Sequence, residues 1–341
     1  MKIFSVLIIR KGDNNIMVHE QLGIYKVKLH LPFRLNHVNC YAVKGNKGWW
    51  LVDAGLGDLS TILAWKQFFL EHEILPTDIK GIYLTHFHPD HYGCSGWLQN
   101  YSGAKVYIGE IDAKRLNHYS KNEESSSKEL GIFYKNNGMP QELVNAVMDS
   151  DVKLIHFMQP RARLTTLKDN EMVKLGDYEY QVILTPGHSD GHICFYNMEY
   201  GVIFAGDHLL HEISPNISLM PQPGADPNPL RSFLISLNYI RHFNCKLALP
   251  AHGMPFSDIK ERISKLEAHH KERLEVIKNC AGNGANAYQV CSQVFRQDIS
   301  IHELRFAMGE TLAHLSYSTY KGELEVVSKD GIDIYSKKNI T

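Results

Sequence analysis

Residues 85–91 read Thr-His-Phe-His-Pro-Asp-His and bring three imidazoles and a carboxylate close together in the chain. In an extended segment His86 and His88 point to the same side, because side chains alternate along a strand. Asp90 and His91 follow where the chain turns into a helix. One metal ion can therefore take His86 and His88 while a neighbouring ion takes Asp90 and His91. Imidazole combined with carboxylate oxygen suits divalent zinc, with manganese, iron or cobalt as alternatives.

Two such ions need more ligands than this cluster holds, and three residues elsewhere in the chain follow apolar runs and can supply them. His188 would complete three histidines on the first ion, and His252 would join Asp90 and His91 on the second. Asp207 has two carboxylate oxygens and could bridge both ions. Paired ions lower the pKa of a water between them and stabilise a developing oxyanion, so a bridging hydroxide is the expected nucleophile.

Most other histidines stand alone in the sequence, and a lone histidine is more often a surface or core residue than a ligand. We assign His37, His192 and His302 to such ordinary positions. His208, which follows Asp207 directly, is different, because it could contact a leaving group.

The elements that must position the ligands repeat one pattern. Five times, a short apolar run typical of a strand ends, and a His or Asp follows within a few residues. These runs are residues 49–52, 82–84, 180–184, 202–205 and 247–249. Helical spacing appears between them, as in residues 59–72. The pattern predicts an α/β fold in which strand ends at one sheet edge bring the ligand loops together.

The chain length of 341 residues suggests one larger domain with an appendage. We expect a catalytic domain over residues 1–258, with a helical insertion over about 111–170 that acts either as a lid or as a structural element. Within it, the polar run 121–128 is expected to loop out. Residues 259–341 predict three helices and a β-hairpin, which together make a small winged-helix-like domain.

With these motifs in view, residues 23–260 resemble the metallo-β-lactamase superfamily. The resemblance rests on Asp53 in Leu-Val-Asp-Ala-Gly, the 86–91 cluster, His188 in Thr-Pro-Gly-His-Ser, Asp207 in Ala-Gly-Asp-His and His252 in Pro-Ala-His-Gly. It implies a four-layer αββα sandwich (α/β, or α+β) with metal ions in a cleft at one sheet edge. It also implies that Asp53 orients ligands without binding metal itself.

Particular residues narrow the branch of this family. His88 stands where the redox-active diiron members carry Glu, which argues against oxygen or nitric-oxide reduction. Asp207 stands where lactamases of the single-cysteine type carry Cys. No long insert resembles the nucleic-acid-processing β-CASP domain, and the C-terminal region resembles the winged-helix tail of the hydrolases called lactamase-beta-two-like.

Composition limits the partners. The formal net charge is −1, so nothing draws the whole protein toward nucleic acid or an anionic membrane. No apolar run reaches the ~18 residues of a membrane span, and six cysteines without a C-x-x-C pair suit free thiols in a reducing compartment. The apolar stretch 3–9 lacks a cleavage site for a signal peptide. We therefore expect a cytoplasmic protein, with Met17 as an alternative start and a homodimer left open.

The expected activity is hydrolysis of a small ester, thioester or lactone, with Asp90 orienting the nucleophile or receiving its proton. The alternative is a single-stranded RNA or DNA endonuclease of the same fold. The region from Glu261 to the end carries as many acidic as basic side chains, which weakens that alternative because nucleic-acid binders usually show a positive surplus. A winged-helix regulator with a vestigial metal site is a third reading, and the complete ligand set argues against it.

Overall fold

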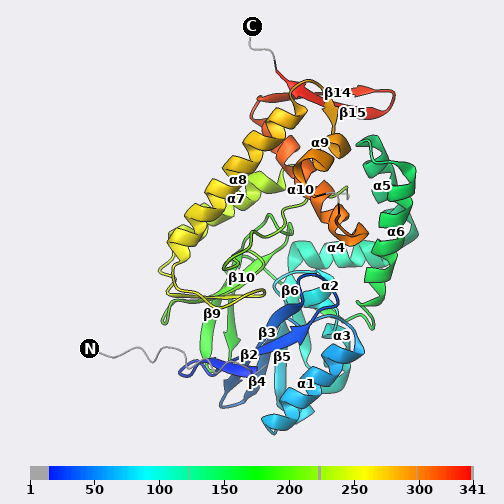
Figure 1. The fold of residues 1–341 in the computed structure, drawn as a ribbon. Helices are drawn as coiled ribbons and strands as arrows, with labels where there is room; N and C mark the ends of the chain where they lie inside the picture. Colours follow the sequence, from blue (N-terminus) through cyan, green and yellow to red (C-terminus); the bar gives the residue numbers. More distant parts are fainter. Residues whose placement is uncertain (1–14, 122, 222–223, 297, 339–341) are drawn as a thin grey trace.

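The computed structural model describes residues 15–121, 123–221, 224–296 and 298–338 (Figure 1). The apolar stretch 3–9 noted above lies outside the described residues. Most of the chain forms two β-sheets with helices on their outer faces, and the remainder forms a helical region above them.

The first sheet has seven described strands, which follow the order of the chain. They are β1 (Asn15–His19), β2 (Ile24–His30), β3 (His37–Gly45), β4 (Gly48–Val52), β5 (Ile79–Tyr83), β6 (Lys105–Gly109) and β7 (Leu164–Leu167). Strands β1 to β4 pair antiparallel, whereas β4 to β7 run parallel. Helices α1 (Leu59–Glu71) and α3 (Ser95–Ser102) connect the parallel strands, as such crossovers require.

The second sheet has five described strands in the order β12-β11-β10-β9-β8. They are β8 (Met172–Leu175), β9 (Tyr178–Leu184), β10 (Ile193–Asn197), β11 (Val202–Gly206) and β12 (Leu247–Pro250). Strands β11 and β12 pair parallel and the others antiparallel. Helices α7 (Pro229–Arg241) and α8 (Ile259–Ala281) cover the outer face of this sheet (Figure 1).

Three buried clusters hold these layers together. Trp65 and Phe68 of α1 pack on one face of the first sheet. Aromatic and branched side chains such as Phe195 and Phe204 fill the space between the two sheets. Phe233 of α7 and Ile263 of α8 pack on the outer face of the second sheet. The predicted four-layer αββα sandwich is therefore confirmed.

The expected insertion is mostly helical, with two corrections. It contains α4 (Glu110–Lys121), α5 (Glu123–Asn136) and α6 (Gln141–His156). The prediction that residues 121–128 loop out is wrong, because α5 begins at Glu123; its buried Leu130 and Tyr134 lie one helical turn apart and stabilise it. Residues 164–167, also inside the expected insertion, form edge strand β7 of the first sheet.

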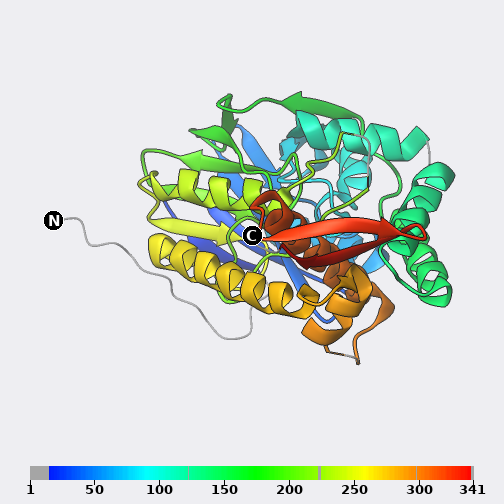
Figure 2. The same cartoon turned by 90° about the horizontal axis from the view of Figure 1, so that it is seen from above.

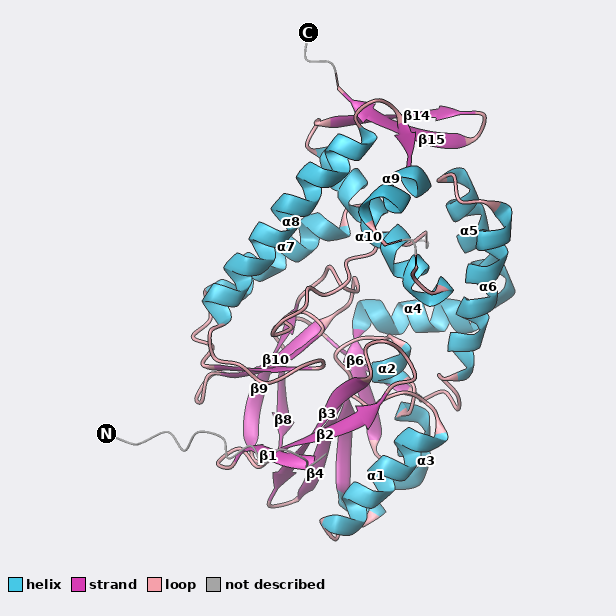
Figure 3. Ribbon diagram, viewed as in Figure 1, coloured by secondary structure: helices cyan, strands magenta, loops and turns pink. Residues whose placement is uncertain are grey.

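After α8 the chain forms β13 (Ala285–Asn286), α9 (Ala287–Val294), α10 (Ile301–Tyr320), β14 (Leu324–Lys329) and β15 (Ile332–Lys337). The predicted hairpin is confirmed. Asp330 and Gly331 at its tip both have positive φ, 52° and 77°, which a tight two-residue turn requires. Figure 3 shows β14 and β15 at the end of the molecule away from the two sheets, whereas α10 extends toward the sheets, where His302 contacts Phe33. The winged-helix description and the boundary at residue 258 stay predictions.

The C-terminal region and the insertion share one core. Tyr134 of α5 and Val147 of α6 are buried together with Ile277 of α8 and Leu312 of α10. Figure 2, seen from above, shows the hairpin crossing over α10 toward α5 and α6. Among the described residues, none of the helices has both the length and the apolar character that crossing a membrane requires.

Candidate metal centre

The five segments that carry predicted site residues leave their strands at one edge. Asp53 follows β4 and the 86–91 cluster follows β5, and these two strands run parallel. His188, Asp207 and His252 follow β9, β11 and β12, which share one direction within the second sheet. Short helix α2 (Pro89–Tyr92) turns the cluster away from the sheet just after His88. All seven predicted ligands therefore meet at one edge of the sandwich.

The first donor group consists of His86, His88 and His188. Nε2 of His86 lies 3.0 Å from Nδ1 of His88, and that Nδ1 lies 2.9 Å from Nε2 of His188. Each ring offers one nitrogen to the space between them, which is the arrangement that a three-histidine metal site needs.

The second donor group consists of Asp90, His91 and His252. Oδ2 of Asp90 lies 3.5 Å from Nε2 of His252 and 3.7 Å from Nε2 of His91. A carboxylate with two imidazoles is a donor set that zinc and similar divalent ions accept.

Asp207 lies between the two groups. Its Oδ2 is 3.3 Å from Nε2 of His188, whereas its Oδ1 is 3.5 Å from Nε2 of His252 and 3.7 Å from Nε2 of His91. The two oxygens of one carboxylate thus face different donor groups.

The outward nitrogens of three histidines fix which nitrogen faces the centre. Nδ1 of His188 donates to the carbonyl of Asn216 at 2.7 Å, and Nδ1 of His252 donates to the carbonyl of His37 at 2.8 Å. Nδ1 of His91 lies 2.9 Å from the Asp53 carboxylate. Because carbonyl and carboxylate oxygens only accept, Nδ1 carries the proton in each ring, and in the neutral ring the Nε2 lone pair is free for a metal ion.

Buried polar atoms at the centre support a fit to metal ions. Nε2 of His91 and Oδ1 of Asp207 are buried, and neither has a hydrogen-bond partner among the residues that the structure describes. A buried polar atom without a partner is costly. A divalent cation between these atoms would satisfy both.

The pKa values of the ligand histidines are shifted in two directions. Burial lowers the pKa of His86, His88 and His188, so these rings are neutral and able to bind metal. Burial also opposes charge on His252, but the Asp207 and Asp90 carboxylates outweigh it and raise its pKa to about 10. Without metal, the positive charge of the His252 imidazolium offsets the negative charge of Asp207 and Asp90. Bound divalent cations would offset that negative charge in its place.

Asp53 lies behind the donor groups. It accepts hydrogen bonds from the backbone N–H of Thr85 at 2.8 Å and from His91, and it is 2% exposed. Its φ of 61° places it in the left-handed region, which Asp tolerates better than most residues. The structure thus places Asp53 against a ligand ring and a ligand-bearing strand end.

His208 is placed differently from the other predicted site residues. Its ring is fully buried, packs edge-on against Phe233 of α7, and has its pKa lowered by burial to about 3. Among the described residues its ring forms no hydrogen bond with a donor group, and its electrostatic interaction with His188 only adds to the lowering of its pKa, so its leaving-group role stays a prediction.

Four residues at the centre were not predicted from the sequence. Nε2 of His192, a residue assigned above to an ordinary position, accepts the backbone N–H of Asp207 at 3.2 Å. Thr85 donates its hydroxyl to Asp53, Asn216 accepts from His188, and Asp112 binds two ligand loops. Thr85 stands next to the cluster and His192 four positions after His188, so proximity could have indicated them. The segment 215–221 around Asn216 suits the lactamase-beta-two-like group but gives no role for Asn216, and nothing in the sequence around Asp112 marks it.

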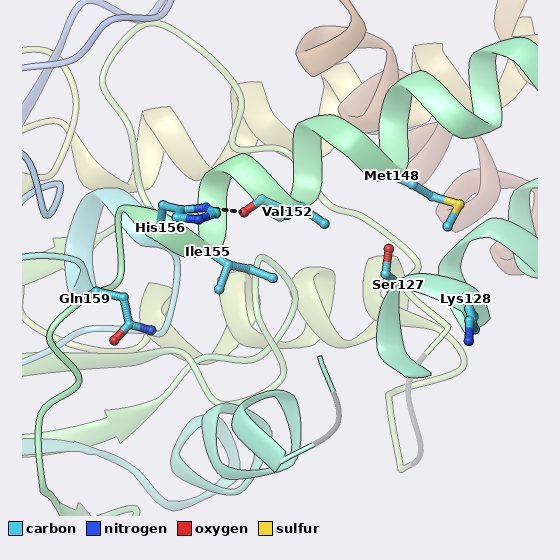
Figure 4. A pocket seen from close by; sticks show the side chains of 7 residues that line it. All are labelled: Ser127, Lys128, Met148, Val152, Ile155, His156 and Gln159. Carbon is cyan, nitrogen blue, oxygen red and sulfur yellow. Dashed lines mark hydrogen bonds between the residues drawn. The ribbon is translucent and has the colours of Figure 1, made fainter. Parts of the chain in front are cut away.

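A separate pocket of about 540 Å³ lies between α5 and α6 (Figure 4). It is lined by Met148, Val152 and Ile155 of α6 and by Ser127 and Lys128 of α5. None of the predicted metal ligands lines this pocket. It belongs to the helical insertion rather than to the metal centre.

The fold and the donor groups together define a class of protein, the metal-dependent hydrolases built on an αββα sandwich. A family model described as "Metallo-beta-lactamase superfamily" matches residues 34–252, and a second, "Metallo-beta-lactamase-like, C-terminal domain", matches residues 274–338. The chain belongs to the metallo-β-lactamase superfamily and is a metallo-hydrolase, as its sequence predicted.

Individual proteins agree with this assignment. The probable metallo-hydrolase YqjP of Bacillus subtilis (strain 168) is 26% identical over 299 residues, which cover 86% of this chain and 91% of YqjP. The crystal structure of the metallo-beta-lactamase family protein TTHA1429 from Thermus thermophilus matches with a TM-score of 0.83 and 31% identity, covering 93% of this chain and 99% of that chain. The acyl-coenzyme A thioesterase MBLAC2 of Gallus gallus is 28% identical over 201 residues, 54% of this chain and 62% of that protein.

Proposed function

We propose that the protein is a dinuclear zinc hydrolase that cleaves a small thioester, ester or lactone. The observation that carries the proposal is the position of Asp207, whose two oxygens face two separate donor groups. A single ion would leave one of these groups without a role. Two ions would use the three histidines on one side, the Asp90 group on the other, and the Asp207 carboxylate between them.

The donor set favours zinc, with manganese, iron or cobalt as alternatives, because it combines neutral imidazoles with two carboxylates. When bound, a pair of such ions would supply a water of lowered pKa and polarise the carbonyl oxygen of the substrate.

The protein's own residues orient this chemistry. Burial alone would raise the pKa of Asp90, but His91 and His252 outweigh it and hold the pKa below its usual range. Asp90 is therefore a carboxylate, and its side chain is 22% exposed, the largest exposure among the Asp residues at the centre. We assign it the role of holding the attacking water by accepting its hydrogen bond. Asp53 orients His91 and is a positioning residue.

The choice of substrate rests on the relatives and on charge. MBLAC2 is named an acyl-coenzyme A thioesterase, and a thioester carbonyl is an electrophile that the proposed centre can attack. The near-neutral chain, with a C-terminal region of balanced charge, offers little attraction to the phosphates of a nucleic acid. We assign the C-terminal region a packing and substrate-shaping role.

The test is a parallel assay of zinc-loaded protein on an acyl-coenzyme A thioester, a p-nitrophenyl ester, a lactone, a phosphodiester and single-stranded RNA. We expect turnover of the carbonyl substrates and a loss of about 10²–10⁴-fold in kcat for Asp90→Ala. Asp58→Asn is the matched control, because Asp58 only caps α1 and Asn caps helices equally well.

Metal analysis of the same samples checks the centre separately. We expect two zinc ions per chain, and fewer in Asp207→Ala. Turnover of RNA alone, lost in the Asp90→Ala variant, would favour the endonuclease alternative and overturn the proposed substrate class.

A further inference from the structure

The helical insertion reaches the metal centre through one buried acid, Asp112 of α4. Its side chain is fully buried. Oδ2 accepts the Ser189 hydroxyl at 2.8 Å and the Phe87 backbone N–H at 3.1 Å, while Oδ1 accepts the Gly191 backbone N–H at 2.9 Å. These three donors come from two loops that lie about a hundred residues apart in the sequence.

The positions of these donors matter because of their neighbours. Phe87 stands between the ligands His86 and His88, so its N–H fixes the extended peptide that puts both rings on one side. Ser189 directly follows the ligand His188. A single carboxylate thus connects the backbone segments that carry all three members of the three-histidine group.

The next turn of α4 strengthens the same connection. Arg115, three residues after Asp112, forms an ion pair with Asp190, which lies between Ser189 and Gly191. Its guanidinium also lies over the Phe87 ring, 5.9 Å from the centroid. One face of α4 therefore holds both loops, with a hydrogen-bonding acid and a cation.

Gly191 and Asp112 are packed closely against each other. A Cβ on Gly191 would lie 2.8 Å from Cγ of Asp112, closer than real Cβ contacts allow. Only a residue without a side chain lets the 188–191 loop approach the carboxylate this closely. The loop and the acid are fitted to each other at this point.

The Asp90 group is held by other residues. His91 is oriented by Asp53, and His252 by the carbonyl of His37. Asp112 forms no hydrogen bond with Asp90, His91 or His252 themselves among the described residues. A change at Asp112 should therefore act on one donor group and spare the other.

We propose that Asp112 is a positioning residue that sets the distance between His188 and the His86–His88 pair, so that the insertion controls metal binding at the three-histidine group. This inference rests on the proposed dinuclear centre. It assigns the insertion a role at the centre itself, in addition to any role as a lid.

The test is a Co²⁺ titration of metal-free protein, followed by visible absorption, on the unsubstituted chain and on Asp112→Asn. The Asn amide nitrogen cannot accept, so the backbone N–H of Gly191 or of Phe87 loses its partner. We expect one Co²⁺ equivalent to bind as in the unsubstituted chain and the other to bind about 10–100-fold more weakly. Asp151→Asn is the matched control, a buried acid of the same insertion that pairs with Arg305 of α10.

Two further variants keep the test decisive. Ser189→Ala removes one hydroxyl and should weaken the same equivalent by less, even if Asp112→Asn fails to fold. Adding Asp112→Asn to His88→Ala, which already lacks the three-histidine group, should change the affinity of the remaining equivalent little.

Full-affinity binding of both equivalents by Asp112→Asn and by Ser189→Ala would overturn the proposal and leave Asp112 as a residue that only stabilises the fold. Failure of the unsubstituted chain to bind two ions would instead count against the dinuclear centre itself. That result is recognisable before any variant is compared.

Discussion

The Asp53 carboxylate lies 2.9 Å from Nδ1 of His91, and both side chains are buried. The other nitrogen of the same ring, Nε2, faces Asp90 and Asp207 at 3.7 Å from each. Asp53 thus determines which nitrogen of His91 is presented to the centre, although it lies on the far side of the ring.

Asp53→Asn is expected to weaken zinc binding at the Asp90 group by about 10–100-fold, because the amide is a weaker acceptor and removes a negative charge behind the ligand. Asn tolerates the positive φ of this position, so the backbone should keep its conformation. Competition with a chromophoric chelator measures the affinity. Unchanged affinity in a correctly folded variant would show that the hydrogen bond to His91 does not tune the site.

Much of this centre could be predicted from the sequence because strand periodicity and loop position are local signals. His86 and His88 share a side of an extended segment, and His188, Asp207 and His252 each follow an apolar run. Loops that follow strands of one direction lie at one edge of a sheet, so the position of these residues after apolar runs indicated that they could converge.

What could not be predicted depends on tertiary contacts. Asp112 lies in a helix whose sequence carries no motif, and its partners lie in two distant loops. The start of α5 was not predicted because the polar run there has no apolar period, whereas the packing of Leu130 and Tyr134 that stabilises the helix comes from α6 and the C-terminal region. Neither contact can be recognised from the residues that are neighbours in the sequence.

Stability of the metal-free protein should fall as the pH rises above neutrality. The folded-state pKa of His252 is about 10, above its ordinary value of 6.5, because Asp207 and Asp90 outweigh burial. The stabilisation is therefore fully present below about pH 6.5 and is lost as the pH rises toward 10. Thermal melts of chelated protein between about pH 6 and pH 9 measure the effect, and metal-free His252→Gln should show a flatter profile.

Zinc should reverse this trend. Metal binding requires the neutral imidazole, so the rise in Tm on adding zinc should grow over the same pH range. A metal-free Tm that is flat or that rises with pH would contradict the electrostatic account of His252.

Gly309 of α10 should affect metal binding although it touches no ligand. A Cβ at this position would lie 2.7 Å from Cβ of Ser218, in the segment whose Asn216 carbonyl orients His188. Gly309→Ala should therefore cost about 1–3 kcal/mol in stability and also weaken zinc binding. Gly282→Ala is the control, because Gly282 has ordinary φ and its nearest contact would be 3.3 Å. Loss of stability with unchanged zinc affinity would show that α10 does not position His188.

His302 tests whether α10 supplies chemistry or packing. Its ring stacks on Phe33 with centroids 4.5 Å apart and an angle of 15°, and its buried Nδ1 has no hydrogen-bond partner in the described part of the chain. Phe at this position keeps the stack and removes the unpaired nitrogen, so His302→Phe should leave stability equal or higher and kcat within about twofold. His302→Ala loses the stack and should be destabilised by about 1–3 kcal/mol. A stable His302→Phe protein with strongly reduced kcat would instead show that the imidazole takes part in the reaction.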